Sequence, residues 1–190
     1  MRGRDGDMLS RDAFLRLIEQ HTPVLLKVTS ALVGFADAED AAQEAVLRAW
    51  QARASLRDPD ALRPWLMQIA VNVCRGWRRG RFGRERRHEQ PLTAETRELL
   101  ATLEADPGTL SHAAALDLRQ AINALDAELR LVVVLRYYAG LDATAIGLIA
   151  SVPPATIRTR LRRALTLLRE RLRDSGHLPS APSREGAPHD

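Results

Sequence analysis

The sequence predicts an all-α protein made of two small helical domains joined by a flexible linker, the C-terminal one containing a helix-turn-helix. Apolar side chains recur at helical spacing over most of the 190 residues, and no segment alternates between apolar and polar residues as a half-buried strand would. A charged segment with Pro91, Pro107 and Gly108 separates two groups of amphipathic segments. We therefore expect domains at 10–81 and 110–173, a linker at 82–109 and a disordered tail at 174–190.

The first domain is expected to begin with a helix. Ser10 can cap that helix, and Asp12 favours its first turn. Pro23 indicates either a kink or a break between two helices, because proline lacks the backbone donor that a helix interior uses. A turn at 34–37 follows.

Two further helices complete the first domain. Asp37 is expected to cap a helix that runs to about Trp50. A loop at 51–62 separates it from a helix over about 63–79, which carries apolar residues at helical spacing.

The helix that begins at Asp37 carries a second stripe beside its alanine-rich inner face. Asp40, Gln43, Glu44 and Leu47 fall at i, i+3, i+4 and i+7 and share one side. Acids at a helix N-terminus also complement the helix dipole, but that does not account for Gln43 or Leu47. We interpret the stripe as a protein-docking surface.

A catalytic or metal-binding role for these acids has little support. No histidine, glycine-rich phosphate loop or third carboxylate cluster accompanies them. We expect no enzymatic activity, no catalytic residue, no metal ion and no cofactor.

The second domain ends in two helices separated by a short turn. An amphipathic run over 121–138 ends near Gly140, which suits the position after a helix. The next segment, 141–152, has Asp142 as its N-cap, and a break at 151–153 leads to a helix over 154–173. Such a pair is typical of a helix-turn-helix, whose second helix enters the DNA major groove.

The last helix has an apolar side and an arginine side. Arginine can contact both phosphate and guanine, although an arginine face can also be simply solvated. The side opposite the apolar stripe carries Arg158, Thr159, Arg162 and Arg163.

The net charge of +4 hides a strong segregation of charge. Segments 75–87 and 157–173 each hold seven arginines and one acid, whereas 88–128 holds eight acids and two arginines. Two basic segments on either side of an acidic one indicate two contacts with a polyanion. The near absence of lysine is also what a GC-rich coding sequence would produce.

Cysteine content and the lack of long apolar runs indicate the cellular compartment of the protein. Cys74 is the only cysteine, so a disulfide within the chain is impossible, which fits a reducing cytoplasm. Neither a signal peptide nor an apolar run of membrane length is visible, so we expect a cytoplasmic protein that does not insert into a membrane.

Four segments occur in an informative order: DAEDAAQEAVLRAW, RPWLMQIAVNVCRGWRR, ALDAELRLVVVLRYYAGL and ATIRTRLRRALTLLRERL. Together they resemble the bacterial extracytoplasmic-function sigma factors, the small two-domain class of RNA polymerase sigma subunits. The resemblance covers residues 14–172. It implies a protein that binds core RNA polymerase, recognises the −35 and −10 promoter elements and promotes DNA melting.

The resemblance implies that the acidic helix docks on the clamp helices of the β′ subunit, with the β subunit as a further contact. It assigns core binding to Asp37, Asp40, Gln43, Glu44 and Leu47. An anti-sigma factor is an implied partner, and no small-molecule substrate is implied.

The resemblance assigns the −10 element to the loop at 53–60 and the helix after it. Aromatic rings suit contact with unpaired bases, and Trp50 and Trp77 are candidates, whereas Trp65 is expected in the core. The implied DNA-binding residues are Arg53, Asn72, Arg75, Arg78 and Arg79.

The resemblance assigns the −35 element to the last helix. The implied contacts are Thr156, Arg158, Thr159, Arg162 and Arg163. The chain departs from the family pattern at Gly76, Ala145 and Gly147, and in the turn at 153–155.

An autonomous helix-turn-helix regulator is the main alternative. It accounts for the last third of the chain but leaves the docking stripe unexplained. An enzyme acting on nucleic acid and a pure protein-interaction module are weaker alternatives.

Overall fold

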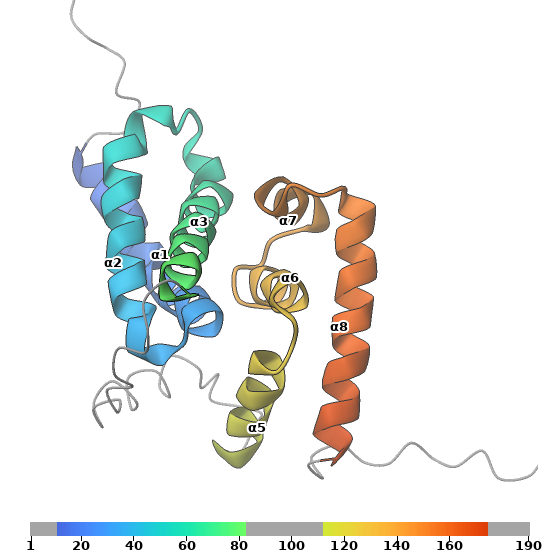
Figure 1. The fold of residues 1–190 in the computed structure, drawn as a ribbon. Helices are drawn as coiled ribbons and strands as arrows, with labels where there is room; N and C mark the ends of the chain where they lie inside the picture. Colours follow the sequence, from blue (N-terminus) through green and yellow to red (C-terminus); the bar gives the residue numbers. More distant parts are fainter. Residues whose placement is uncertain (1–10, 83–111, 175–190) are drawn as a thin grey trace, which may run out of the picture.

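The computed structural model describes residues 11–82 and 112–174. These ranges contain helices and no strand, which confirms the all-α class. The expected Ser10 cap, the linker from residue 83 onward and the tail from residue 175 onward lie outside the described residues. The helices are α1 (Arg11–Val33), α2 (Phe35–Ala52), α3 (Leu62–Phe82), α5 (His112–Asn123), α6 (Ala127–Tyr137), α7 (Ala143–Ala150) and α8 (Pro154–Asp174), with 3-10 turns at Arg53–Ser55 and Pro59–Ala61 between α2 and α3 (Figure 1).

α1 is a single helix that continues through Pro23. The sequence predicts either a kink or a break at this position, and the structure shows no break. The buried side of α1 includes Phe14, Ile18, Leu25 and Val28, so packing on both sides of the proline compensates for the missing backbone bond.

One residue, Gly34, connects α1 to α2. It has a φ of 89°, and its N–H donates to the Ser30 carbonyl at 3.0 Å. Because glycine accepts this left-handed conformation, the turn needs no further residues and α2 begins at Phe35. The prediction that Asp37 caps α2 is therefore wrong, and Asp37 lies in the first helical turn.

α2 packs closely against α1 and α3 because its inner face is built from small side chains. A buried alanine face lets neighbouring backbones approach and leaves the outer side of the helix to polar residues. The buried residues are Ala38, Ala41, Ala42, Ala45 and Ala49.

The expected single run over 121–138 is two helices, because the chain turns at 124–126. The Leu125 N–H bonds back to Ile122, and the Leu125 side chain is buried at the corner. The Arg130 guanidinium donates to the carbonyl of Asn123, the last residue of α5, and to that of Leu125 in the turn. These bonds satisfy carbonyls that the helix itself leaves open.

The middle of α6 is apolar on all sides, and its charged residues Glu128, Arg130 and Arg136 lie nearer the ends of the helix. Leu129 and the five residues 131–135 are all buried. A helix of this kind must be covered all round, and α6 packs against α8 and α7 on one side and α1 on the other. Gly140, with a φ of 67°, follows the helix as predicted.

The predicted helix-turn-helix is present. The Asp142 side chain accepts from the Ala145 N–H at 2.7 Å, which confirms it as the N-cap of α7. Ser151 takes the left-handed conformation, with a φ of 58°, and α8 begins at Pro154 after this short turn.

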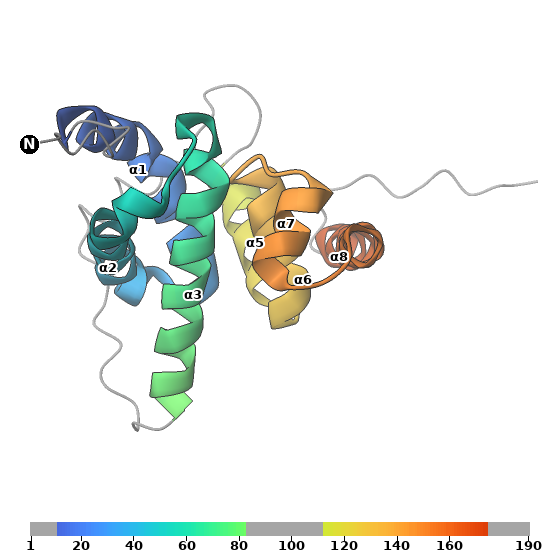
Figure 2. The ribbon, with the colours of Figure 1, turned by 90° about the horizontal axis from the view of Figure 1, so that it is seen from above.

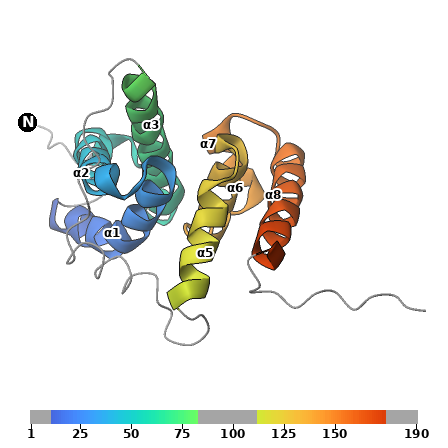
Figure 3. The same ribbon diagram turned by 60° about the horizontal axis from the view of Figure 1, so that its bottom comes forward.

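The two parts of the structure lie against each other. Figures 2 and 3 show α5, α6 and α7 beside the first three helices and α8 on the far side. The buried residues of both parts form one hydrophobic cluster. The contacts between them run from α1 to α6 and α5 and from α3 to α7.

Candidate functional site

The stripe predicted on α2 divides into two parts. Asp40, Gln43 and Leu47 are exposed, and Leu47 exposes 56% of its surface. Asp37 is half-buried in the first turn. The structure therefore brings an acid, an amide and a large apolar side chain together on one outward face.

Glu44 differs from the rest of the stripe because its carboxylate is engaged within the protein. Its Oε2 accepts from the Trp77 indole Nε1 of α3 at 2.5 Å, and its Oε1 pairs with Arg48 at 2.5 Å. Spacing along α2 does not reveal the contact with Trp77, which lies 33 residues further along the chain.

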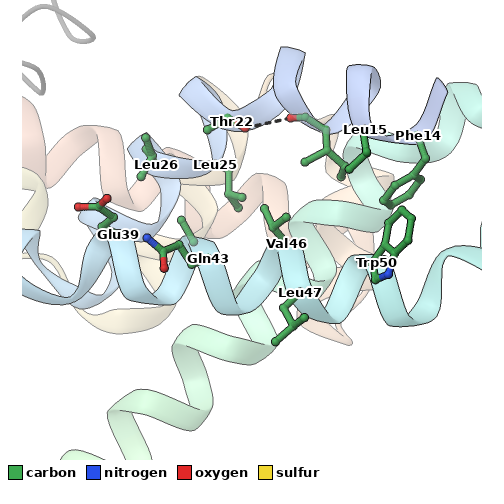
Figure 4. A pocket seen from close by; sticks show the side chains of 12 residues that line it. Phe14, Leu15, Thr22, Leu25, Leu26, Glu39, Gln43, Val46, Leu47 and Trp50 are labelled. Atoms are coloured by element: carbon green, nitrogen blue, oxygen red, sulfur yellow. Dashed lines mark hydrogen bonds between the residues drawn. The ribbon is translucent and has the colours of Figure 1, made fainter. Parts of the chain in front are cut away.

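An apolar groove of about 520 Å³ runs beside the stripe, between α1 and α2. Figure 4 shows Val46 of α2 pointing toward Leu15 and Leu25 of α1, and Leu47 pointing away from α1 at the edge of the groove. Sequence reasoning missed the groove because it needs both helices. The available signal was the pair Leu15 and Leu47, which are exposed although each lies on an amphipathic helix.

The segment before α3 is held by aromatic side chains. The Arg53 guanidinium lies 4.3 Å from the centroid of the Trp50 ring, and its Nη1 donates to the Trp50 carbonyl. The Trp65 indole donates to Ser55 Oγ at 3.3 Å. Trp65 is half-buried, with its ring edge-on to buried Phe14, so its place beside the core agrees with the prediction.

The residues predicted on α3 occupy one side of its second half. Asn72, Arg75 and Arg79 are exposed at i, i+3 and i+7, and Arg78 is half-buried. The Arg75 guanidinium donates to the Ile149 carbonyl of α7 at 3.4 Å, so one of these arginines contacts the helix-turn-helix in this arrangement.

α8 presents its predicted arginine face to solvent. Ile157, Ala164 and Leu168 are buried on the inner side. Glu128 of α6 pairs with Arg160, which is outside the predicted set, at 2.6 Å. Arg158, Thr159, Arg162 and Arg163 are exposed together, and Thr156 beside them is half-buried.

Burial perturbs several ionisable groups. It raises the pKa of the Cys74 thiol to about 12 and also raises the pKa of Tyr138. Burial lowers the pKa of Arg130, and the nearby positive charge of Arg78 on α3 lowers it further. The positive charges of these two arginines, one from each part, therefore repel each other.

Neither a metal site nor a membrane span is found in the described part of the chain. Across residues 11–82 and 112–174, no three acidic, histidine or cysteine side chains are grouped so as to hold a metal ion. No helix in the same ranges combines the length and the apolar character needed to cross a membrane.

Known sequences and structures match both parts. The family model for sigma-70 region 2 matches residues 17–82, and the model for sigma-70 region 4 matches residues 115–168. The chain is 30% identical over 177 residues to the ECF RNA polymerase sigma factor SigL of Mycobacterium tuberculosis, covering 90% of this chain and 96% of that protein. The chain belongs to the extracytoplasmic-function sigma factors. Sigma factors of this family are non-enzymatic and direct RNA polymerase to promoters.

Two further matches agree. RfaY of Xanthomonas campestris pv. campestris, named as a probable RNA polymerase sigma factor, is 33% identical over 157 residues, covering 80% of this sigma factor and 37% of RfaY. The structure of the sigma factor RpoE in complex with the anti-sigma factor NepR, from Bartonella quintana, matches with a TM-score of 0.66 and 23% identity. It covers 86% of this chain and 98% of that one, and it shows the same fold.

Proposed function

We propose that this sigma factor joins core RNA polymerase in the bacterial cytoplasm, holds the −35 element with α8 and opens the −10 element with α3. The observation that carries this proposal is the exposed stripe of Asp40, Gln43 and Leu47 on the same chain as a helix-turn-helix. An autonomous regulator has no need of such a docking surface, and the match to region 2 further disfavours that alternative.

Core docking is assigned to α2. Asp37, Asp40 and Gln43 would contact the clamp helices of β′ through charge and hydrogen bonds. Leu47 and the adjoining groove supply an apolar area that a partner helix can cover. The acids beside the groove, Asp37 and Asp40, would pair with basic residues on such a helix.

The −10 contacts are assigned to the end of α2 and the outer side of α3. Phosphate contacts from arginine position a duplex, and an amide can pair with a base edge. The proposed residues of α3 lie on one side of that helix, which supports contact with one continuous stretch of DNA. The proposed residues are Arg53, Asn72, Arg75, Arg78 and Arg79.

The −35 contacts are assigned to α8, whose first turns follow the tight turn at Ser151. The N-terminal residues of a recognition helix are those that reach base edges in the major groove. The proposed residues are Thr156, Arg158, Thr159, Arg162 and Arg163.

Domain limits and an inhibitor complete the proposal. We assign the core-binding and −10 domain to 10–81, the linker to 82–109, the −35 domain to 110–173 and the tail to 174–190. The likeness to a sigma factor solved with an anti-sigma factor supports an anti-sigma partner for this chain.

Transcription in vitro on a promoter library tests the proposal. Purified chain with core polymerase should select a family of promoters with two shared elements, and core alone should not. Tight binding of the chain alone to one duplex, with no transcription from any promoter when core is present, would overturn it.

A further inference from the structure

The second half of α3 is a poor helix by its own sequence. Gly76 and Gly80 each weaken a helix interior relative to alanine, because glycine loses more backbone freedom on folding. Arg75, Arg78 and Arg79 place like charges three and four residues apart, which destabilises it further. The negative end of the helix dipole offsets only part of that repulsion. We call residues 75–80 the arginine end of α3.

Among the residues that the structure describes, one polar contact ties this arginine end to the body of the first part. Trp77 is half-buried, and its indole N–H donates to the Glu44 carboxylate of α2 at 2.5 Å. A hydrogen bond to a carboxylate is among the stronger kinds. Glu44 also places a negative charge near this positive segment. The charges of Glu44 and Arg78 both act on the same side chain, the Cys74 thiol.

Glu44 is set apart from its neighbours on the stripe by this geometry. Asp40 and Gln43 are exposed, but both carboxylate oxygens of Glu44 have partners within the protein. The Arg48 pair is on the surface, with 53% of the Arg48 side chain exposed, and contributes little. The contact with Trp77 is therefore the one with structural consequence.

We infer that Glu44 is a positioning residue that holds Trp77, and with it the arginine end of α3, in the helical form that presents Arg75, Arg78 and Arg79 to the −10 element. The inference rests on the proposed function for the role of those arginines. It assigns Glu44 to promoter opening rather than to direct contact with core polymerase.

The free protein provides the first test, by amide hydrogen exchange. Glu44→Ala and Trp77→Phe should each speed exchange at residues 76–80 roughly tenfold or more, with residues 66–72 of the same helix unchanged. The double variant should exchange no faster than either single variant, because both remove one bond. Arg48→Ala is the matched control, and it should leave exchange unchanged.

The second test separates promoter opening from core binding. Glu44→Ala and Trp77→Phe should bind core polymerase within about twofold of the unaltered chain but open promoter DNA roughly tenfold more slowly. Glu44→Gln retains an acceptor for Trp77 and should recover most of the rate. Asp40→Ala should show the opposite pattern, with weaker core binding and unchanged exchange at 76–80.

A suppressor provides the sharpest test. A Cβ on Gly76 or Gly80 meets no atom within 4 Å, so alanine fits at both positions. Gly76→Ala with Gly80→Ala, added to Glu44→Ala, should restore slow exchange and promoter opening, since the helix then needs the bond less. Unchanged exchange in Glu44→Ala, or loss of core affinity in Glu44→Ala but not in Trp77→Phe, would overturn the inference. If the chain directs no transcription at all, the proposed function is wrong. The effect of Glu44→Ala on hydrogen exchange would not be affected by that result.

Discussion

Gly147 and Val152 approach so closely across the turn of the helix-turn-helix that a Cβ on Gly147 would lie 2.7 Å from the Val152 carbonyl oxygen. The same position lies 3.5 Å from the Pro154 nitrogen, and the Val152 N–H donates to the Gly147 carbonyl at 3.0 Å. The stiff turn before Pro154 and the glycine in α7 are therefore matched, although the sequence showed them only as two departures from the family pattern.

Gly147→Ala should destabilise the second part, because the backbone of the turn must shift to admit a methyl group. We expect a loss of about 1–3 kcal/mol in the free energy of unfolding, measured by urea denaturation. Gly76→Ala is the control, since that position is open. Equal stability for Gly147→Ala and the unaltered chain would show that the turn is freer than the structure indicates.

Arg162→Ala should distinguish base contact from phosphate contact on α8. If Arg162 reads a base, the variant should lose about 1–3 kcal/mol at one promoter position only, whereas a phosphate contact should weaken all sequences alike. Transcription on a library of −35 variants measures the difference. Arg173, exposed at the other end of α8, provides a control substitution, and no change for Arg162→Ala would remove that residue from the interface.

Asp40→Arg should weaken binding to core polymerase by roughly tenfold, through reversal of charge in the docking stripe. Fluorescence titration with core polymerase measures the affinity. Glu19→Arg makes the same change of charge at an exposed position of α1 and should have little effect. Equal affinities for the two variants would place the interface elsewhere.

The buried thiol of Cys74 should make stability depend on alkaline pH. Its pKa is about 12 in the folded chain and 9.0 without burial. The unfolded chain loses that proton at a lower pH than the folded chain. The contribution of the thiol to the free energy of unfolding is therefore complete below pH 9 and is lost as the pH rises from 9 toward 12. Tyr138, whose pKa burial also raises, acts in the same direction.

Comparison with Cys74→Ala isolates the contribution of the thiol. Urea denaturation of the two proteins at pH 8 and pH 10 should show a smaller loss of stability for Cys74→Ala. Thiol reagents at pH 8 should label the unaltered chain only as fast as it unfolds. Rapid labelling of the folded protein would contradict this description of the site.

The two parts must separate when the chain occupies a promoter. Elements centred near −35 and −10 lie roughly 25 base pairs apart, which is about 85 Å of B-DNA, whereas α3 contacts α7 here. Spin labels at Gln68→Cys and Thr144→Cys, both exposed, should report a short distance in the free chain and a much longer one with core polymerase and promoter. A distance that stays short in the complete complex would refute the two-site assignment.

Much of the fold follows from local sequence signals. Helical periodicity located α3, α7 and α8, and the Asp142 cap and the Pro154 start were correct because capping depends on a few adjacent residues. The start of α2 was missed because the left-handed Gly34 makes the turn by itself. The division between α5 and α6 was missed because Leu125 continues the apolar pattern through the corner.

The candidate site was less accessible to the sequence. Periodicity placed Asp40, Gln43 and Leu47 on one exposed face, as found. It also grouped Glu44 with them, because spacing along one helix does not reveal a partner such as Trp77 on another. The groove was missed for the same reason, since it is formed by two helices.

The burial of the middle of α6 on all sides has a consequence for how the chain tolerates mutation. Residues 131–135 must satisfy the neighbours in α8 and α7 and those in α1 at once. A substitution among these five side chains should therefore disturb both the packing of the second part and its contact with the first. The outer face of α8 is exposed and has no such packing to satisfy, so substitutions there should change DNA contact while leaving the stability of the fold nearly unaltered.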